Sequence, residues 1–223
     1  MNQAELDSIW NYYLSIEQDL AATSRYIEPS RQENVYSFEF SKLLVLSCTE
    51  AEAVFKAICK AITEKECGNI GEYKEVILGS FPRIVTAEVS IPRWGQVIRP
   101  FEGWDTGKLE WWDAYGAVKH NRGSNFESAS YKNAVYALSA LYILIFYLAK
   151  THNIRITDTK STYIVSAYAF RLFACAPTKQ LPDFDNPNSI NKPFEKVEDT
   201  AKIEASNTEP MELHDGDIWI QTE

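Results

Sequence analysis

The chain has few of the residues that hold small secreted or metal-bound proteins together. It contains four cysteines and three histidines in 223 residues, and the cysteines at positions 48, 59, 67 and 175 form no Cys-x-x-Cys pair. The histidines lie far from the cysteines in sequence, so neither a disulfide framework nor a zinc site is predicted, and no cofactor is expected. Cys48 and Cys59 fall in apolar helical sequence, which predicts buried free thiols in a reducing compartment.

Long apolar runs are also scarce. The N-terminus has no basic segment followed by an apolar run, so no signal peptide is expected. The most apolar stretch, Ala134 to Ala149, is shorter than the roughly 20 residues that span a membrane, and it carries three tyrosines. This stretch is predicted to be a buried core helix, in a soluble cytoplasmic protein that binds no membrane.

The chain also lacks a surplus of basic residues. Its net charge is −9, but the segment from Thr178 onward holds eleven Asp and Glu against four Lys, which leaves −2 on the rest. A near-neutral body neither demands nor excludes nucleic acid. From about residue 177, acidic residues, Pro and Asn dominate, so residues 1–176 are predicted to form one domain and residues 177–223 a mobile acidic tail.

What the sequence does have is helical periodicity, because apolar residues recur every three or four positions. Helices are predicted over residues 3–24, 37–66, 70–78, 106–120 (N-capped by Asp105 or Thr106) and from 126 or 127 to about 150. The β-branched run 84–91, a turn at 92–95 and residues 97–98 predict a hairpin, and residues 161–174 have the composition of strands. The predicted fold class is mainly α: an up-and-down helical bundle with a small β-hairpin insertion and an extended acidic C-terminal tail.

One segment, residues 111–122, concentrates chemically useful side chains. At 100° per residue, one broad face of its helix carries aromatic and cationic groups, namely Trp112, Tyr115, Lys119 and Arg122. His120 lies on the adjoining face, and Gly116, one turn earlier, leaves space beside the imidazole. A titratable histidine between two cations suits a phosphate group. The same residues also fit an ordinary helix C-terminus with core tryptophans, so both interpretations stay open.

The order of these motifs resembles the HEPN superfamily of small helical-bundle domains found in bacterial toxin–antitoxin and antiviral systems. Glu50, Glu52 and Lys56 supply the first element, on a long helix, and the Trp-Trp-x-x-Tyr-x-x-x-Lys-His-x-Arg segment precedes a final apolar helix. The resemblance covers roughly residues 1–150. It implies a metal-independent endoribonuclease in which two copies meet in a homodimer and promote attack of a ribose 2′-hydroxyl on the adjacent phosphate.

The resemblance assigns catalytic roles to a few residues only. His120 matches the family's histidine and is expected to act as acid or base. The family's arginine four to six residues upstream is missing, because Tyr115 stands five residues before His120. Lys119 and Arg122 are expected to contact phosphate, and Tyr115 to donate a hydrogen bond.

Three functions are therefore open. The first is a protein that binds or cleaves RNA as a homodimer, and the second is a catalytically inactive module that binds an antitoxin or another protein partner. The third is a small-molecule binder with Trp111, Trp112 and Tyr115 lining an aromatic cleft.

Overall fold

The computed structural model describes residues 1–156, apart from 30, 92–93 and 155. Three expectations lie outside these residues: the strands at 161–174, the domain boundary at 176, and the acidic tail.

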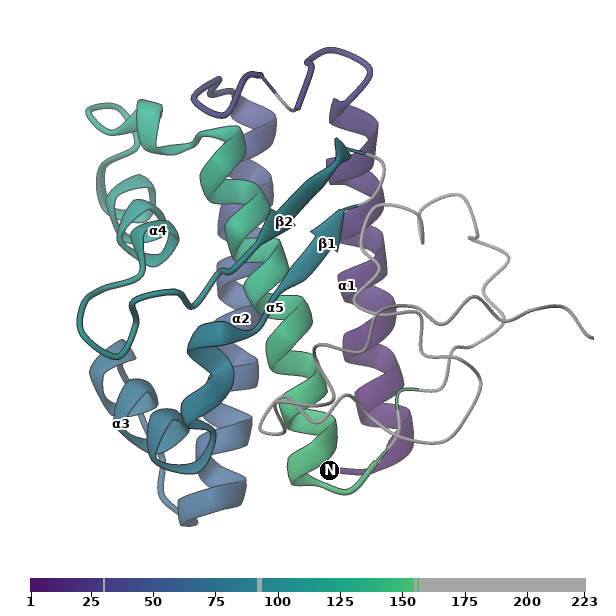
Figure 1. Ribbon diagram of the computed structural model, residues 1–223, viewed down its shortest axis with the longest axis vertical. Coiled ribbons are helices and arrows are strands. Elements are labelled where there is room, and N and C mark those ends of the chain that lie inside the picture. Colours follow the sequence, from purple (N-terminus) through teal and green to yellow (C-terminus); the bar gives the residue numbers. More distant parts are fainter. Residues whose placement is uncertain (30, 92–93, 155, 157–223) are drawn as a thin grey trace, which may run out of the picture. The chain divides into compact units, whose positions relative to one another are not determined.

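The described part of the chain is mainly helical, as predicted (Figure 1). Its elements, in chain order, are α1 (Gln3–Thr23), α2 (Phe38–Thr63), α3 (Ile70–Ser80), the 3₁₀ helix η1 (Pro82–Thr86), β1 (Val89–Ile91), β2 (Gln96–Ile98), α4 (Glu110–Asn121), the 3₁₀ helix η3 (Phe126–Ser128) and α5 (Tyr131–Thr151).

Four helices form an up-and-down bundle with α2 and α5 at its centre. α1 packs on one side of this pair and α4 on the other (Figure 1). The end of α1 is tied to the start of α2 by an ion pair of Asp19 with Lys42, so these two helices are antiparallel. α2 and α5 begin at the same end of the bundle, where Tyr36 and Ser130 form an isolated β-bridge. This shared end is also where α4 finishes (Figure 1).

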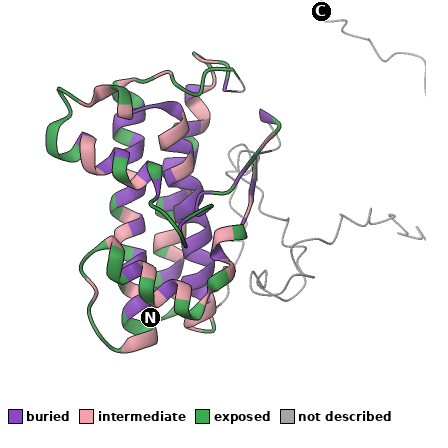
Figure 2. Cartoon of the chain, turned by 60° about the vertical axis from the view of Figure 1, so that its left-hand side comes forward, coloured by how far each residue is buried: buried purple, intermediate pink, exposed green. Residues whose placement is uncertain are grey.

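The core is built around α5, in which every residue from Ala137 to Ala149 is buried. Figure 2 shows buried residues on the helix faces that turn toward one another and exposed residues on the outside. α5 is long and apolar enough to cross a membrane, but 83% of its most apolar window is buried by the rest of the chain. That burial is typical of the core helix of a soluble protein, because a membrane span presents its apolar residues to lipid.

Polar side chains fix where most helices begin. The side chains of Asn2, Ser37, Asn69 and Ser130 each accept a hydrogen bond from a backbone N–H in the first turn of α1, α2, α3 and α5. Each of these bonds satisfies a donor that the helix itself leaves without a partner. Ser130 rather than Phe126 starts the last long helix, because residues 126–128 form the separate turn η3.

α4 begins four residues later than predicted, and neither Asp105 nor Thr106 caps it. The side chains of Phe101 and Trp104 are buried in the core and hold the preceding segment in turns. Gly103 adopts a φ of 73°, and its carbonyl accepts a hydrogen bond from Gly107 at 2.8 Å. A left-handed residue interrupts helical geometry, so the helix starts only after this segment.

Two other boundaries differ from expectation. α2 ends at Thr63, before the predicted end at residue 66, because Glu64 is left-handed with a φ of 61°. The predicted hairpin is present with the register Val89–Ile98, but its first strand is shorter because Ile84 lies in η1. The hairpin contacts the start of α5, where Trp94 packs edge-on against Tyr131 with ring centroids 5.9 Å apart.

Candidate functional site

The candidate segment is anchored through its tryptophans. The Trp111 side chain is 1% exposed, and its indole Nε1 donates a hydrogen bond to the Pro100 carbonyl at 2.8 Å. Trp112 packs edge-on against Phe55 of α2, with ring centroids 5.8 Å apart. These contacts fix α4 against α2 and leave its C-terminal turn to face solvent.

The aromatic cleft considered from the sequence is not formed by these residues. Tyr115 is 5% exposed and packs against Trp112, with ring centroids 5.5 Å apart. Trp111 also packs edge-on against Phe101, at 6.1 Å. Trp111 and Tyr115 belong to the core and Trp112 packs partly buried against it, so these side chains stabilise α4 and do not form an aromatic cleft.

Tyr115 and Lys119 are brought together, as their i, i+4 spacing predicts. The Lys119 ammonium lies 5.1 Å from the centre of the Tyr115 ring. A hydrogen bond from Lys119 to Tyr115 raises the pKa of the lysine, and the Glu52 carboxylate on α2 adds to the increase. Lys119 therefore carries its full positive charge at neutral pH while remaining exposed.

Glu52 and Lys56, which belong to the first motif of the resemblance, form an ion pair on α2 at 2.7 Å. The negative charge of Glu52 is also one of the smaller causes that raise the pKa of Lys119 on α4. Glu50 lies elsewhere on the helix and is half-buried, and burial raises the pKa of its carboxyl group. The first motif is therefore partly structural, since Glu52 pairs with Lys56.

His120 is exposed near the end of α4. It lies about 140° around the helix from Tyr115, so its ring points away from the Tyr115–Lys119 pair. Within the described residues, no side chain makes a hydrogen bond or ion pair with it. An added Cβ on Gly116, one turn earlier, would meet nothing within 4 Å, so the helix surface beside the imidazole is open.

Arg122 ends α4 and leans toward the start of α2. Its guanidinium carbon lies 5.8 Å from the centre of the Phe38 ring, within the range of a cation–π contact. Phe38 in turn packs against Phe126 at 4.9 Å, and Tyr36 packs against Phe126 at 5.3 Å. We call these three rings, Tyr36, Phe38 and Phe126, the aromatic platform.

The four residues predicted for the site are thus divided among three surroundings. Tyr115 and Lys119 form one pair, Arg122 rests on Phe38 of the aromatic platform, and His120 faces solvent from another side of the helix. All three cationic or titratable groups reach solvent at one end of α4, but they do not converge on a single point within one copy of the chain.

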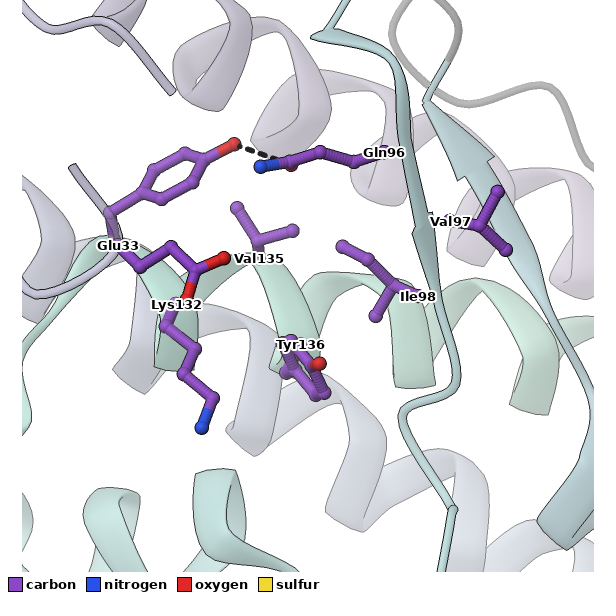
Figure 3. Close-up of a pocket in the computed structure, with 8 residues that line it drawn as sticks. Glu33, Gln96, Val97, Ile98, Lys132, Val135 and Tyr136 are labelled. Atoms are coloured by element: carbon purple, nitrogen blue, oxygen red, sulfur yellow. Dashed lines mark hydrogen bonds between the residues drawn. The ribbon is translucent and has the colours of Figure 1, made fainter. Parts of the chain in front are cut away.

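A separate pocket of about 120 Å³ lies between β2 and the start of α5 (Figure 3). The Tyr131 hydroxyl donates to Gln96 Oε1 at 3.1 Å, and the Gln96 amide donates to the Pro29 carbonyl. The ammonium of Lys132, which also lines the pocket, is paired with Glu110 of α4 at 2.9 Å. Because ligand pockets typically measure about 300–1,000 Å³, this one fits a few water molecules better than a nucleotide.

The thiols and possible metal ligands are placed as follows. Cys48 and Cys59 are free and buried, as expected, and burial raises the pKa of Cys59 to about 12. Cys67 is free and half-buried. Over residues 1–156, apart from the few undescribed positions, no three His, Cys, Asp or Glu side chains are grouped as metal ligands would be.

Sequence reasoning missed the aromatic platform. Neither Tyr36 nor Phe38 is singled out by the motifs of the sequence. The available signal was a pair of large aromatic residues flanking the helix cap Ser37, where polar residues are more usual.

In comparisons with known proteins, no family model, curated protein or solved structure matches this chain.

Proposed function

We propose that this chain is an HEPN-like cytoplasmic protein that binds RNA and cleaves it without a metal ion, in a bacterial toxin–antitoxin or phage-defence setting. The observation that carries the proposal is that His120 and its neighbours in sequence, the cations Lys119 and Arg122, all reach solvent at one end of α4. α2 and α5 begin at this same end, and the N-termini of helices favour negative charge.

The chemistry would be an internal transfer at phosphorus. The imidazole of His120 accepts the proton of a ribose 2′-hydroxyl while the 2′-oxygen attacks the adjacent phosphorus. The bond from phosphorus to the 5′-oxygen breaks, and an acid donates a proton to that leaving oxygen. The products are a 2′,3′-cyclic phosphate and a 5′-hydroxyl, while Lys119 and Arg122 stabilise the charge on the phosphoryl oxygens.

The divided arrangement of the residues supports a homodimer. In an in-line displacement the attacking and leaving oxygens lie on opposite sides of phosphorus, so base and acid must approach from opposite sides. One exposed imidazole cannot occupy both positions. A second copy placing its own His120 across a two-fold axis would supply the other group.

The experiment is an RNA cleavage assay on the full chain in the presence of EDTA. We expect the wild-type chain to release products ending in a 2′,3′-cyclic phosphate, and His120→Ala to lower the rate by about 10²- to 10⁴-fold, the usual contribution of a general acid or base. His152→Gln, a change at the end of α5, is the matched control and should keep full activity. Cleavage that persists in folded His120→Ala protein would refute the assignment.

A catalytically inactive interaction module is the second candidate. It is favoured by the exposed rings of the aromatic platform and by Tyr115 in place of the family's upstream arginine, since that tyrosine is part of the core. Its partner would be an antitoxin or another protein. Wild-type protein that cleaves no RNA, but whose oligomeric state or RNA affinity changes when residues 178–223 are deleted, would favour this function.

A further inference from the structure

We infer that the aromatic platform of Tyr36, Phe38 and Phe126 stacks an unpaired base of single-stranded RNA, while Arg122 binds the neighbouring phosphate. This inference deepens the proposed function and rests on it, because it names the class of RNA that the end of α4 would accept. The three rings lie outside the proposed catalytic group, while Arg122, which rests on Phe38, is shared with it.

Exposure is the first argument. Phe38 is 72% exposed and Tyr36 is 47% exposed, although large apolar rings are usually covered in a folded chain. They lie beside each other through Phe126, so they form a patch and not two isolated rings. An exposed aromatic patch next to cationic groups marks a surface for a partner.

Rigidity is the second argument, because backbone hydrogen bonds hold both segments of the platform. The Tyr131 N–H donates to the Val35 carbonyl at 2.8 Å, and the Lys132 N–H donates to the Glu33 carbonyl at 3.0 Å. On the other side, the N–H of Ala129 donates to the carbonyl of Phe126 at 2.9 Å. Because the backbone that carries the rings is held in place, little backbone entropy is lost when a base stacks on them.

The cation is the third argument, and it selects the partner. A guanidinium that rests on a phenyl ring keeps its N–H groups available for a phosphate, whose geometry it matches. Glu39, next to Phe38, is paired with Lys42 at 2.9 Å, and because Lys42 also pairs with Asp19, it offsets only part of the negative charge near the platform. Base faces are open only where RNA is unpaired, which makes single-stranded RNA the expected partner and double-stranded RNA a poor one.

The test measures binding of a fluorescein-labelled 12-nucleotide single-stranded RNA to the full chain, in the His120→Ala background so that the RNA stays intact. We expect Phe38→Ala to weaken binding by about 5- to 100-fold, the usual effect of removing one stacking ring. Phe38→Leu, which keeps the apolar bulk but not the flat face, should weaken it similarly, and Phe38→Trp should restore it. An RNA duplex of equal length should bind less tightly and be insensitive to Phe38.

Two controls accompany these variants. Tyr26→Ala removes a ring that is 85% exposed but lies outside the platform, and Glu127→Gln changes a neighbour of Phe126; neither should weaken binding. Circular dichroism and sedimentation of each variant report its fold and oligomeric state.

The outcomes separate this inference from the function it rests on. If the chain with an intact platform binds no single-stranded RNA, both fail. If it binds RNA and folded Phe38→Ala binds equally well, only the platform fails. Loss of self-association in Phe38→Ala, with RNA affinity per subunit unchanged, would show the platform to be an interface between copies, which overturns the inference while leaving RNA binding in place.

Discussion

His152 illustrates how a single residue couples the fold to pH. It caps the end of α5, where its N–H donates to the Leu148 carbonyl. Burial lowers the pKa of its imidazole, the positive N-terminal amine lowers it further, and Glu5 partly opposes this change. The imidazole is therefore harder to protonate in the folded chain than in the unfolded chain.

A pH-dependent stability follows for His152. The folded state binds its proton more weakly than the unfolded chain, whose histidine keeps the ordinary pKa of about 6.5, so stability is lost as the pH falls below that value. Glutamine does not titrate, so His152→Gln should not show this loss of stability. As the pH falls from 7.5 to 5, the free energy of unfolding should decrease more for the wild type than for His152→Gln. Urea denaturation at both pH values measures it. Parallel curves for the two proteins would contradict the assignment.

At the scale of the element, α4 contains a residue that its own stability does not require. Gly116 lies in the interior of the helix, and an added Cβ would contact nothing within 4 Å. Glycine in the middle of a helix costs about 0.5–1 kcal/mol relative to alanine. Packing gives no reason for this residue, whereas a ligand approaching the helix backbone beside His120 would.

We expect Gly116→Ala to raise the free energy of unfolding by about 0.5–1 kcal/mol, as measured by urea denaturation. Ala117→Gly, at the neighbouring position, is the reverse control and should lower it by a similar amount. If RNA approaches the backbone here, the more stable Gly116→Ala variant should cleave RNA more slowly, and misfolding could not explain that loss. A destabilised variant would mean that the surface at Gly116 is not open.

Helical elements were predictable from the sequence where local periodicity decides them. α1 and α5 carry continuous apolar stripes or runs, and their predicted positions agree with the structure within a few residues, apart from the start of α5. The start of α4 was not predictable, because the burial of Phe101 and Trp104 decides it, and burial depends on distant helices. Periodicity shows which face of a helix is apolar. It does not show that buried side chains before the helix will hold the chain in turns and delay the start of the helix.

The contacts of the candidate site also differ in whether the sequence predicts them. The contact between Tyr115 and Lys119 follows from their spacing on one helix, so the sequence contained it. The contact between Arg122 and Phe38 joins residues on different helices far apart in the chain, and no local pattern encodes it. Helical projection placed Arg122 and Lys119 on one face, but only the packing of α4 against α2 gives each its own partner.

At the scale of the whole molecule, the question is how one chain could supply two proton-transfer groups. In the described part of the chain, the histidine other than His120 is His152. It follows α5, a helix of 21 residues that begins at the end of the bundle where α4 finishes, so about 30 Å of helix separates it from that end. His152 therefore cannot reach a phosphate bound at His120, so among the described residues a second imidazole for the proposed cleavage would come from another copy of His120.

Subunit mixing tests this requirement. With a fixed amount of wild-type chain, we expect added His120→Ala chain to lower cleavage toward zero as excess variant draws wild-type subunits into mixed dimers with one imidazole each. The physical reason is that base and acid stand on opposite sides of phosphorus, so a mixed dimer lacks one of them. Sedimentation would check that the chain is a dimer. Added His152→Gln chain, which keeps His120, is the control and should raise total activity. Cleavage that stays constant at a large excess of His120→Ala would mean that each subunit holds a complete site, and Lys119 would then be the group to test as the proton donor.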